Sequence, residues 1–169
     1  MKITLLTVGR TDVDWVKTGL ELYRSRLLHY VLFTVVEIPE LKNASSLSRD
    51  QIKSREGELI LRKLKDSDEV ILLDEKGKEY RSVEFAQMLL SRISTSSRDL
   101  VFVVGGAYGF SKEVYDRSSG MLSLSRMTFS HQMAATAANR NIFFIAQSSF
   151  SQINLLHHRN SGLADHWRQ

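Results

Sequence analysis

The residues best suited to bind a polar ligand lie between positions 100 and 133. An apolar run, Leu100–Val104, has the composition of a strand buried on both faces and ends at Gly105-Gly106. At two consecutive glycines the backbone can turn without a Cβ clash. In open α/β sheets, the turn after such a strand is where ligands usually bind. A tight connection that holds no ligand is the alternative for a Gly-Gly pair taken alone.

Hydroxyl side chains alternate with apolar ones downstream of this turn, just before His131. The hydroxyls belong to Ser123, Ser125, Thr128 and Ser130. Such a segment offers hydroxyls and backbone amides to a polar ligand. A short edge strand followed by a loop would show the same pattern, so both interpretations stay open.

Carboxylates and imidazoles are the remaining groups that could do chemistry. Asp74-Glu75 ends an apolar run and could face a ligand, or could serve a turn or a helix cap. The histidines are His29, His131, His157, His158 and His166. Only His157 and His158 are close in sequence, and adjacent side chains point apart on a helix or strand. The pattern therefore predicts no metal site.

Several common catalytic classes are excluded by missing motifs. The chain has no cysteine, so it has no disulfide, thiolate nucleophile or cysteine-based zinc site. The first predicted strand is followed by Val8-Gly9-Arg10-Thr11 rather than by GxGxxG, which argues against a dinucleotide fold. Neither GxxxxGK[ST] nor GxSxG occurs, which removes P-loop and α/β-hydrolase interpretations.

Length and composition indicate one globular domain. The 169 residues are 43% hydrophobic and 25% charged, and no apolar run has the roughly 18 to 20 residues of a membrane span. We therefore expect a cytoplasmic protein with no membrane partner. The net charge of +4 suits an anionic partner such as RNA.

Strand and helix signals alternate along the chain. The predicted strands are Ile3–Val8, Tyr30–Ile38, Glu69–Asp74, Leu100–Val104 and Met121–Ser125. The predicted helices start near Asp12 or Asp14, run from Ser48 to about Leu64, and cover Ser82–Ile93 and Ser111–Arg117. This order predicts an α/β fold, a mostly parallel sheet with helices on both faces. Ser48 and Gln51 have the spacing of a capping box, 41–48 reads as a polar and mobile loop, and 75–78 reads as a turn.

Taken together, these segments resemble the RlmH family of SPOUT methyltransferases, which methylate pseudouridine in large-subunit ribosomal RNA. The similarity starts with MKITLLTVGR and continues through DWVKTG, ELY, Lys53, EGE and LLDEKGK. Its strongest parts are VVGGAYG, at 103–109, and LSLSRMTFSHQ, at 122–132. Spacing and order agree over residues 1–133.

The resemblance implies a SPOUT-type, trefoil-knotted α/β fold and a homodimer in which each donor site lies against the partner subunit. It implies S-adenosylmethionine as cofactor, held mainly by backbone groups of three loops. Transferred to this chain, the cofactor-binding residues are Leu73, Gly105, Leu124, Ser125, Arg126, Met127, Thr128 and Phe129.

The implied reaction is methyl transfer to N3 of a pseudouridine, with no metal. N3 must lose a proton, and His131 is the candidate catalytic base, with a structural role as the alternative. Basic side chains on the loops, Arg10, Lys42 and Arg126, could hold phosphates of the ribosomal RNA or of the ribosome.

The last part of the chain, 134–169, departs from the family. The family continues with a Glu-Gln, aliphatic, Tyr-Arg-Ala segment and a terminal Tyr-His pair, whereas this tail lacks both and has neither lysine nor glutamate. A frameshift or an altered gene end would explain the departure. We therefore treat 1–169 as a single domain with an atypical tail. The alternative to an active enzyme is a catalytically silent relative that keeps the fold and the donor pocket and binds ribosomes or RNA.

Overall fold

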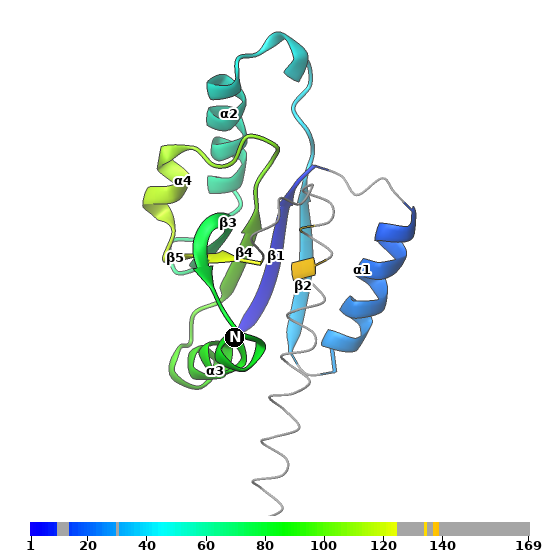
Figure 1. Ribbon diagram of the computed structural model, residues 1–169, viewed down its shortest axis with the longest axis vertical. Coiled ribbons are helices and arrows are strands. Elements are labelled where there is room, and N and C mark those ends of the chain that lie inside the picture. Colours follow the sequence, from blue (N-terminus) through cyan, green and yellow to red (C-terminus); the bar gives the residue numbers. More distant parts are fainter. Residues whose placement is uncertain (10–13, 30, 125–133, 135–136, 139–169) are drawn as a thin grey trace, which may run out of the picture.

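Strands and helices alternate in the computed structural model of the chain, which describes residues 1–9, 14–29, 31–124, 134 and 137–138 (Figure 1). The strands are β1 (Lys2–Val8), β2 (Leu32–Ile38), β3 (Glu69–Glu79), β4 (Leu100–Val104) and β5 (Gly120–Ser123). The helices are α1 (Asp14–Leu27), α2 (Arg49–Leu61), α3 (Ser82–Thr95) and α4 (Lys112–Arg117), with a 3₁₀ turn, η1 (Ala44–Ser46).

The described strands form a parallel sheet in the order β2-β1-β4-β3-β5. β4 lies in the middle of this sheet, and all of its residues are buried, as expected for a strand covered on both faces. The predicted α/β class with a mostly parallel sheet is therefore confirmed. Because parallel strands point the same way, their carboxyl ends share one edge of the sheet, and α2 begins at that end of the molecule (Figure 1).

Each face of the sheet is covered by helices, as predicted. On one face, Phe85 of α3 packs against Phe102 of β4, with ring centroids 6.0 Å apart. On the other face, Ile60 of α2 and Val114 of α4 lie in a second buried cluster with the central strands. Burying side chains of this size stabilises a fold by about 1.5–3 kcal/mol each, so the two cores hold the helices on the sheet.

Helix α2 starts at the predicted capping box. Gln51 N donates to Ser48 Oγ over 3.2 Å, and Ser48 N donates to Gln51 Oε1 over 2.9 Å. The helix ends at Leu61 rather than near Leu64. Past this point Leu64 N donates to the carbonyl of Leu61, three residues back, so the last residues form a tighter turn.

The predicted polar loop at 41–48 contains a short ordered turn, η1. Ser46 N donates to the carbonyl of Asn43, and Leu47 N donates to that of Ala44. Asn43 adopts the left-handed conformation, with φ of 60°, which asparagine tolerates better than most residues. The mobility expected of this loop stays a prediction.

The turn predicted at 75–78 was wrong, because β3 continues through this segment to Glu79. The register with β5 shifts between Leu73 and Lys78, so that both residues are in register with Leu122. Gly77 makes this path possible, since a Cβ built there would lie 2.5 Å from Leu122 N. A turn signal read from four residues cannot reveal a backbone contact with a strand that comes later in the chain.

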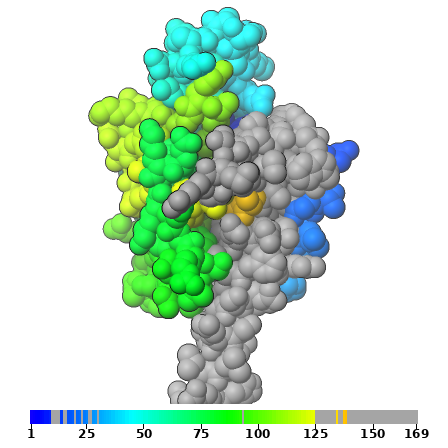
Figure 2. Space-filling model, viewed as in Figure 1, coloured from blue at the N-terminus to red at the C-terminus, as the bar shows by residue number. Residues whose placement is uncertain are grey.

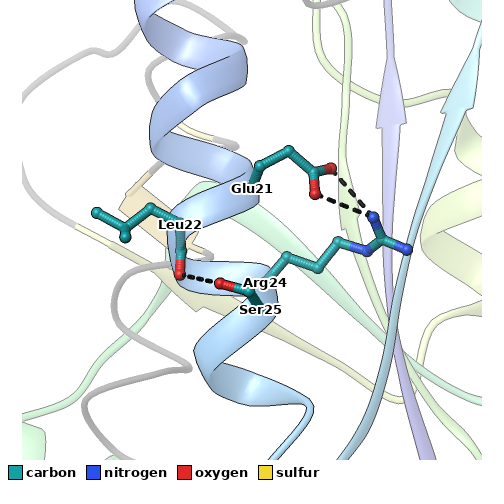
Figure 3. A network of polar contacts seen from close by, with 4 residues as sticks. All are labelled: Glu21, Leu22, Arg24 and Ser25. Atoms are coloured by element: carbon teal, nitrogen blue, oxygen red, sulfur yellow. Dashed lines mark hydrogen bonds and ion pairs between the residues drawn. The ribbon is translucent and has the colours of Figure 1, made fainter.

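Residues of helix α1 form polar contacts with one another on the surface of the helix (Figure 3). Arg24 Nη1 donates to both carboxylate oxygens of Glu21 over 3.1 Å, and Ser25 Oγ donates to the carbonyl of Leu22. The helix begins at Asp14, one of the two predicted starting residues.

Arg117 ties α4 to the connection between α2 and β3. Its Nη2 donates to the carbonyls of Lys65, Asp66 and Asp68 over 2.6 to 3.2 Å. We expect Arg117→Met to lower the free energy of unfolding by about 1–2 kcal/mol, because three carbonyls lose a charged donor. Urea denaturation measures this loss.

The matched control for this prediction is Arg62→Met, at an exposed arginine whose ion pair with Glu58 is 3.8 Å long. Such surface pairs contribute little, so the control is expected to stay within about 0.5 kcal/mol of the parent chain. Equal losses in the two variants would show that the Arg117 contacts do not anchor α4.

Two expectations fall on the chain beyond Leu124. These are the trefoil knot and the atypical tail, and both stay predictions because residues 125–133, 135–136 and 139–169 lie outside the described residues. Of the residues described there, Ala138 is buried in the cluster on the α3 face of the sheet, and Ala134 packs against that cluster. The atypical tail therefore begins with residues that join the core.

Candidate functional site

Three of the predicted cofactor-binding residues meet at the carboxyl edge of the sheet. Leu73 of β3 is in register with Val104 of β4 on one side and with Leu122 of β5 on the other. Gly105 follows Val104 directly, and Leu124 comes two residues after Leu122. Because paired strands lie about 4.8 Å apart, the three neighbouring strands β4, β3 and β5 span roughly 10 Å. The structure thus brings Leu73, Gly105 and Leu124 together.

The other predicted site residues fall on a segment outside the described residues. They are Ser125, Arg126, Met127, Thr128, Phe129 and the candidate base His131. Their roles stay predictions.

The turn after β4 leaves no room for side chains at its two glycines. A Cβ at Gly105 would lie 2.9 Å from the ring of Phe110, and a Cβ at Gly106 would lie 2.8 Å from Glu56 Oε1. Gly109 has a φ of +78°, which L side chains rarely adopt. The two glycines therefore let Phe110 and Glu56 pack directly against the backbone of this turn.

Helix α2 places Glu56 against this turn, and its carboxylate is the polar group that the sequence analysis did not select as a site residue. The Oε2 atom is buried and has no hydrogen-bond partner among the described residues. Burial, followed by repulsion from Glu40, raises the pKa of Glu56. The space-filling view shows the start of α2, in cyan, beside the β4–α4 segment, in yellow-green (Figure 2).

The neighbouring residue, Gly57, is a sequence signal that could have indicated close packing around Glu56. A glycine within a helix weakens the helix and often marks a close approach of another element. A Cβ at Gly57 would lie 3.0 Å from Ser111 Cβ, directly before α4. The glycine therefore marks the side of α2 that packs closely against the rest of the chain.

Thr7 adds a second buried polar group at the same edge. It is in register with Val104 of β4, and its side chain is 3% exposed. Its Oγ1 has no hydrogen-bond partner in the described part of the chain. Buried polar groups without partners are uncommon and mark sites of ligand or water binding. Thr7 and Glu56 therefore lie on two sides of the glycine turn.

Asp74 lies inside β3, and its carboxylate makes structural contacts within the chain. Lys76 N donates to Asp74 Oδ1 over 2.8 Å, and Tyr115 Oη donates to Asp74 Oδ2 over 2.6 Å. Both carboxylate oxygens thus have partners within the chain. Burial, then the hydrogen bond to Asp74, raises the pKa of Tyr115 from 10.0 to about 12.

Removing the Tyr115 hydroxyl should lower stability in a pH-dependent way. The folded pKa exceeds the ordinary value of 10.0, so this bond stabilises the fold fully below pH 10 and its contribution is lost as the pH rises through about 12. We expect Tyr115→Phe to lower the free energy of unfolding by about 1 kcal/mol below pH 10. This difference from the parent chain should shrink as the pH rises above 10. Urea denaturation over this pH range measures the gap.

Tyr108→Phe is the control, since Tyr108 is 45% exposed and the described structure shows its ring stacked with Arg49 rather than a bond from its hydroxyl. Its stability should match that of the parent chain. A gap for Tyr115→Phe that does not depend on pH would contradict the assigned hydrogen bond.

The remaining candidates lie apart from this edge or are exposed. His29 is exposed just after α1, Glu75 is exposed beside Asp74, and Lys42 is exposed between β2 and α2. No group of three or more acidic or histidine side chains is placed to hold a metal ion in the described ranges. No helix among the described residues is long and apolar enough to cross a bilayer.

Comparison with known proteins identifies the family to which this chain belongs. The family described as "Predicted SPOUT methyltransferase" matches residues 1–143. The chain belongs to the SPOUT methyltransferase family. The resemblance to its RlmH members is confirmed by relatives named "Ribosomal RNA large subunit methyltransferase H". One from Parabacteroides distasonis is 49% identical over 133 residues, which cover 79% of this chain and 85% of the relative.

Two further relatives with the same name are matched over longer stretches. The relative from Cytophaga hutchinsonii is 46% identical over 143 residues, covering 85% of this chain and 92% of its own length. That from Flavobacterium johnsoniae is 45% identical over 147 residues, covering 87% and 90%. The matched lengths are shorter than the 169 residues of this SPOUT methyltransferase, in line with the departure of its last part.

A SPOUT methyltransferase needs a methyl donor, and the residues at the sheet edge fit one. Leu73, Gly105 and Leu124 lie at one edge of the sheet, and the side chains of Phe110 and Glu56 pack against the glycine turn there. Glu56 Oε2 and Thr7 Oγ1 are buried polar atoms without a hydrogen-bond partner among the residues that the structure describes. The site therefore combines the edge of three neighbouring strands with buried polar groups that could bind a polar ligand.

Proposed function

We propose that this chain methylates large-subunit ribosomal RNA with S-adenosylmethionine as donor, at N3 of a pseudouridine. One observation carries the proposal: three neighbouring strands bring together Leu73, where the register of β3 shifts, Gly105, directly after β4, and Leu124, directly after β5. The relatives named above act on large-subunit ribosomal RNA according to their names, and the chain spans most of their length. The substrate implies action in the cytoplasm.

The chain's part in the reaction is to bind and orient. The bound donor supplies a methyl group already activated on a sulfonium. Backbone groups at Leu73, Gly105 and Leu124 to Phe129 hold the donor so that its methyl group faces the acceptor nitrogen, and correct alignment supplies several kcal/mol of the barrier. His131 takes the N3 proton as the acceptor reacts.

Substrate binding in this proposal uses a homodimer and basic loops. Each donor site lies against the partner subunit, as the family resemblance implies. Lys42, exposed between β2 and α2, contacts phosphates of the RNA together with Arg10 and Arg126. Phosphate contacts position RNA without reading its sequence, so they set affinity rather than the choice of nucleotide.

Transfer of labelled methyl groups tests this function. Ribosomes that lack the modification are incubated with the full chain and labelled S-adenosylmethionine, and label in large-subunit RNA is measured. We expect label at a single pseudouridine, and none in ribosomes that already carry the modification. Absence of both donor binding and label would refute the proposal.

A second outcome would favour a catalytically silent relative that binds ribosomes or RNA. The family match ends at residue 143, while the chain continues to 169 with a tail unlike that of the family. Donor binding and ribosome binding without methyl transfer would identify this second function. The two functions thus differ in the transfer assay and agree in the binding assay.

A further inference from the structure

The carboxylate of Glu56 is placed without a cation in the described part of the chain. Two basic side chains on its own helix are engaged elsewhere: Lys53 pairs with Asp50 over 3.2 Å, and Arg49 stacks on Tyr108 at 5.5 Å. The charged neighbour that acts on Glu56 is Glu40, which repels it. A partly buried carboxylate in this setting costs free energy unless a proton or a positive group neutralises it.

The position of this carboxylate is fixed by the glycine turn. Gly106 has no side chain, and both carboxylate oxygens of Glu56 lie within 2.8 Å of the position that a Cβ on Gly106 would take. The carboxylate therefore touches the backbone one residue after Gly105, an expected donor contact. A negative charge held beside the donor-binding turn is placed to meet a charge on the donor itself.

We propose that Glu56 binds a positive charge of the methyl donor. This inference rests on the function proposed above, which names the donor. S-adenosylmethionine carries two cations, the sulfonium and the ammonium of its amino-acid part, and both are chemically suited to a carboxylate. Thr7, on the other side of the turn, is uncharged and does not supply this selectivity.

Binding of three ligands to two forms of the full chain tests the proposal. S-adenosylmethionine carries both cations, S-adenosylhomocysteine keeps only the ammonium, and methylthioadenosine has neither. Glu56→Gln keeps the size of the side chain and removes its charge. Isothermal titration calorimetry then gives the dissociation constant of each ligand for each form.

We expect Glu56→Gln to weaken S-adenosylmethionine about 10- to 100-fold, the range for loss of a charge-assisted hydrogen bond, and to leave methylthioadenosine unchanged. The affinity of Glu56→Gln for S-adenosylhomocysteine shows which cation of the donor Glu56 binds. An equal loss for S-adenosylhomocysteine assigns the ammonium, and an unchanged affinity assigns the sulfonium. Either result supports the proposal.

Two further variants serve as a control and as a charge-conserving replacement. Glu58→Gln, at an exposed carboxylate on the same helix, should leave all three affinities unchanged. Glu56→Asp keeps the charge on a side chain that is shorter by one methylene. It should therefore lose less affinity, with the same order among the three ligands. It replaces Glu56→Gln if that variant fails to fold. Unchanged affinities, or equal losses for all three ligands, would overturn the proposal.

Failure here is distinct from failure of the proposed function. If the parent chain does not bind S-adenosylmethionine, the function is refuted. If the parent chain binds the donor and transfers methyl groups while Glu56→Gln does not change the ligand pattern, only the role of Glu56 is refuted.

Discussion

Gly77→Ala is expected to destabilise the chain by about 1–3 kcal/mol, the usual cost of overpacking, and to weaken donor binding at least about 10-fold. A Cβ at this position would lie 2.5 Å from Leu122 N and 2.6 Å from its carbonyl carbon. Both atoms belong to the backbone, so no side chain can rotate away. The strand that must move instead is β5, which leads into the expected donor contact at Leu124.

Urea denaturation and calorimetry with S-adenosylmethionine measure these two effects. Gly120→Ala is the matched control, because Gly120 lies in β5 and its Cβ would meet Ile71 Cδ1 at an ordinary 3.6 Å. The control should bind the donor like the parent chain. Equal behaviour of the two variants would show that Gly77 does not hold β5 in place.

Gly105→Ala is expected to have the second large effect, again about 1–3 kcal/mol in stability together with loss of donor binding. Its Cβ would lie 2.9 Å from Cε1 and 3.0 Å from Cζ of Phe110. This ring is 6% exposed and meets Tyr115 edge-on, with centroids 5.7 Å apart. The ring cannot move without disturbing the contact between α4 and the turn.

A double-mutant cycle with Phe110→Leu separates this clash from other effects. Urea denaturation of the parent chain, both single variants and the double variant gives the coupling. In the Phe110→Leu background, which removes the ring, Gly105→Ala should cost at least about 1 kcal/mol less than in the parent chain. Strictly additive costs would mean that the added methyl group and the ring do not meet.

The sequence predicted those parts of the fold that local signals determine. The capping box of Ser48 and Gln51 and the strand Leu100–Val104 were predicted to the residue, because each depends on neighbours in the chain. The path of β3 past Leu73 was not, since Glu-Lys-Gly-Lys has the composition of a turn and its pairing partner comes more than forty residues later. Local composition carries no information on such a contact.

The candidate site divides in the same way. Leu73, Gly105 and Leu124 were predicted through the family resemblance, and the strand order explains why they meet. Glu56 was missed because α2 is dense in charges and one more carboxylate there suggests a solvated surface. Its burial depends on Gly106, fifty residues later, which no helical pattern can show.

The central position of β4 has a consequence for how the chain folds during synthesis. β1 pairs with β4 along the sheet, and Lys2 N donates to Asp99 Oδ1 across 97 positions of sequence. Until residues 100–104 have been made, β1 and β2 have no sheet partner to join them to β3. Such long-range parallel pairing slows folding, because the connecting chain must be ordered before the contacts form. A nascent chain that stops before Leu100 should therefore remain sensitive to protease, and extension by β4 should bring both halves of the sheet together in one step.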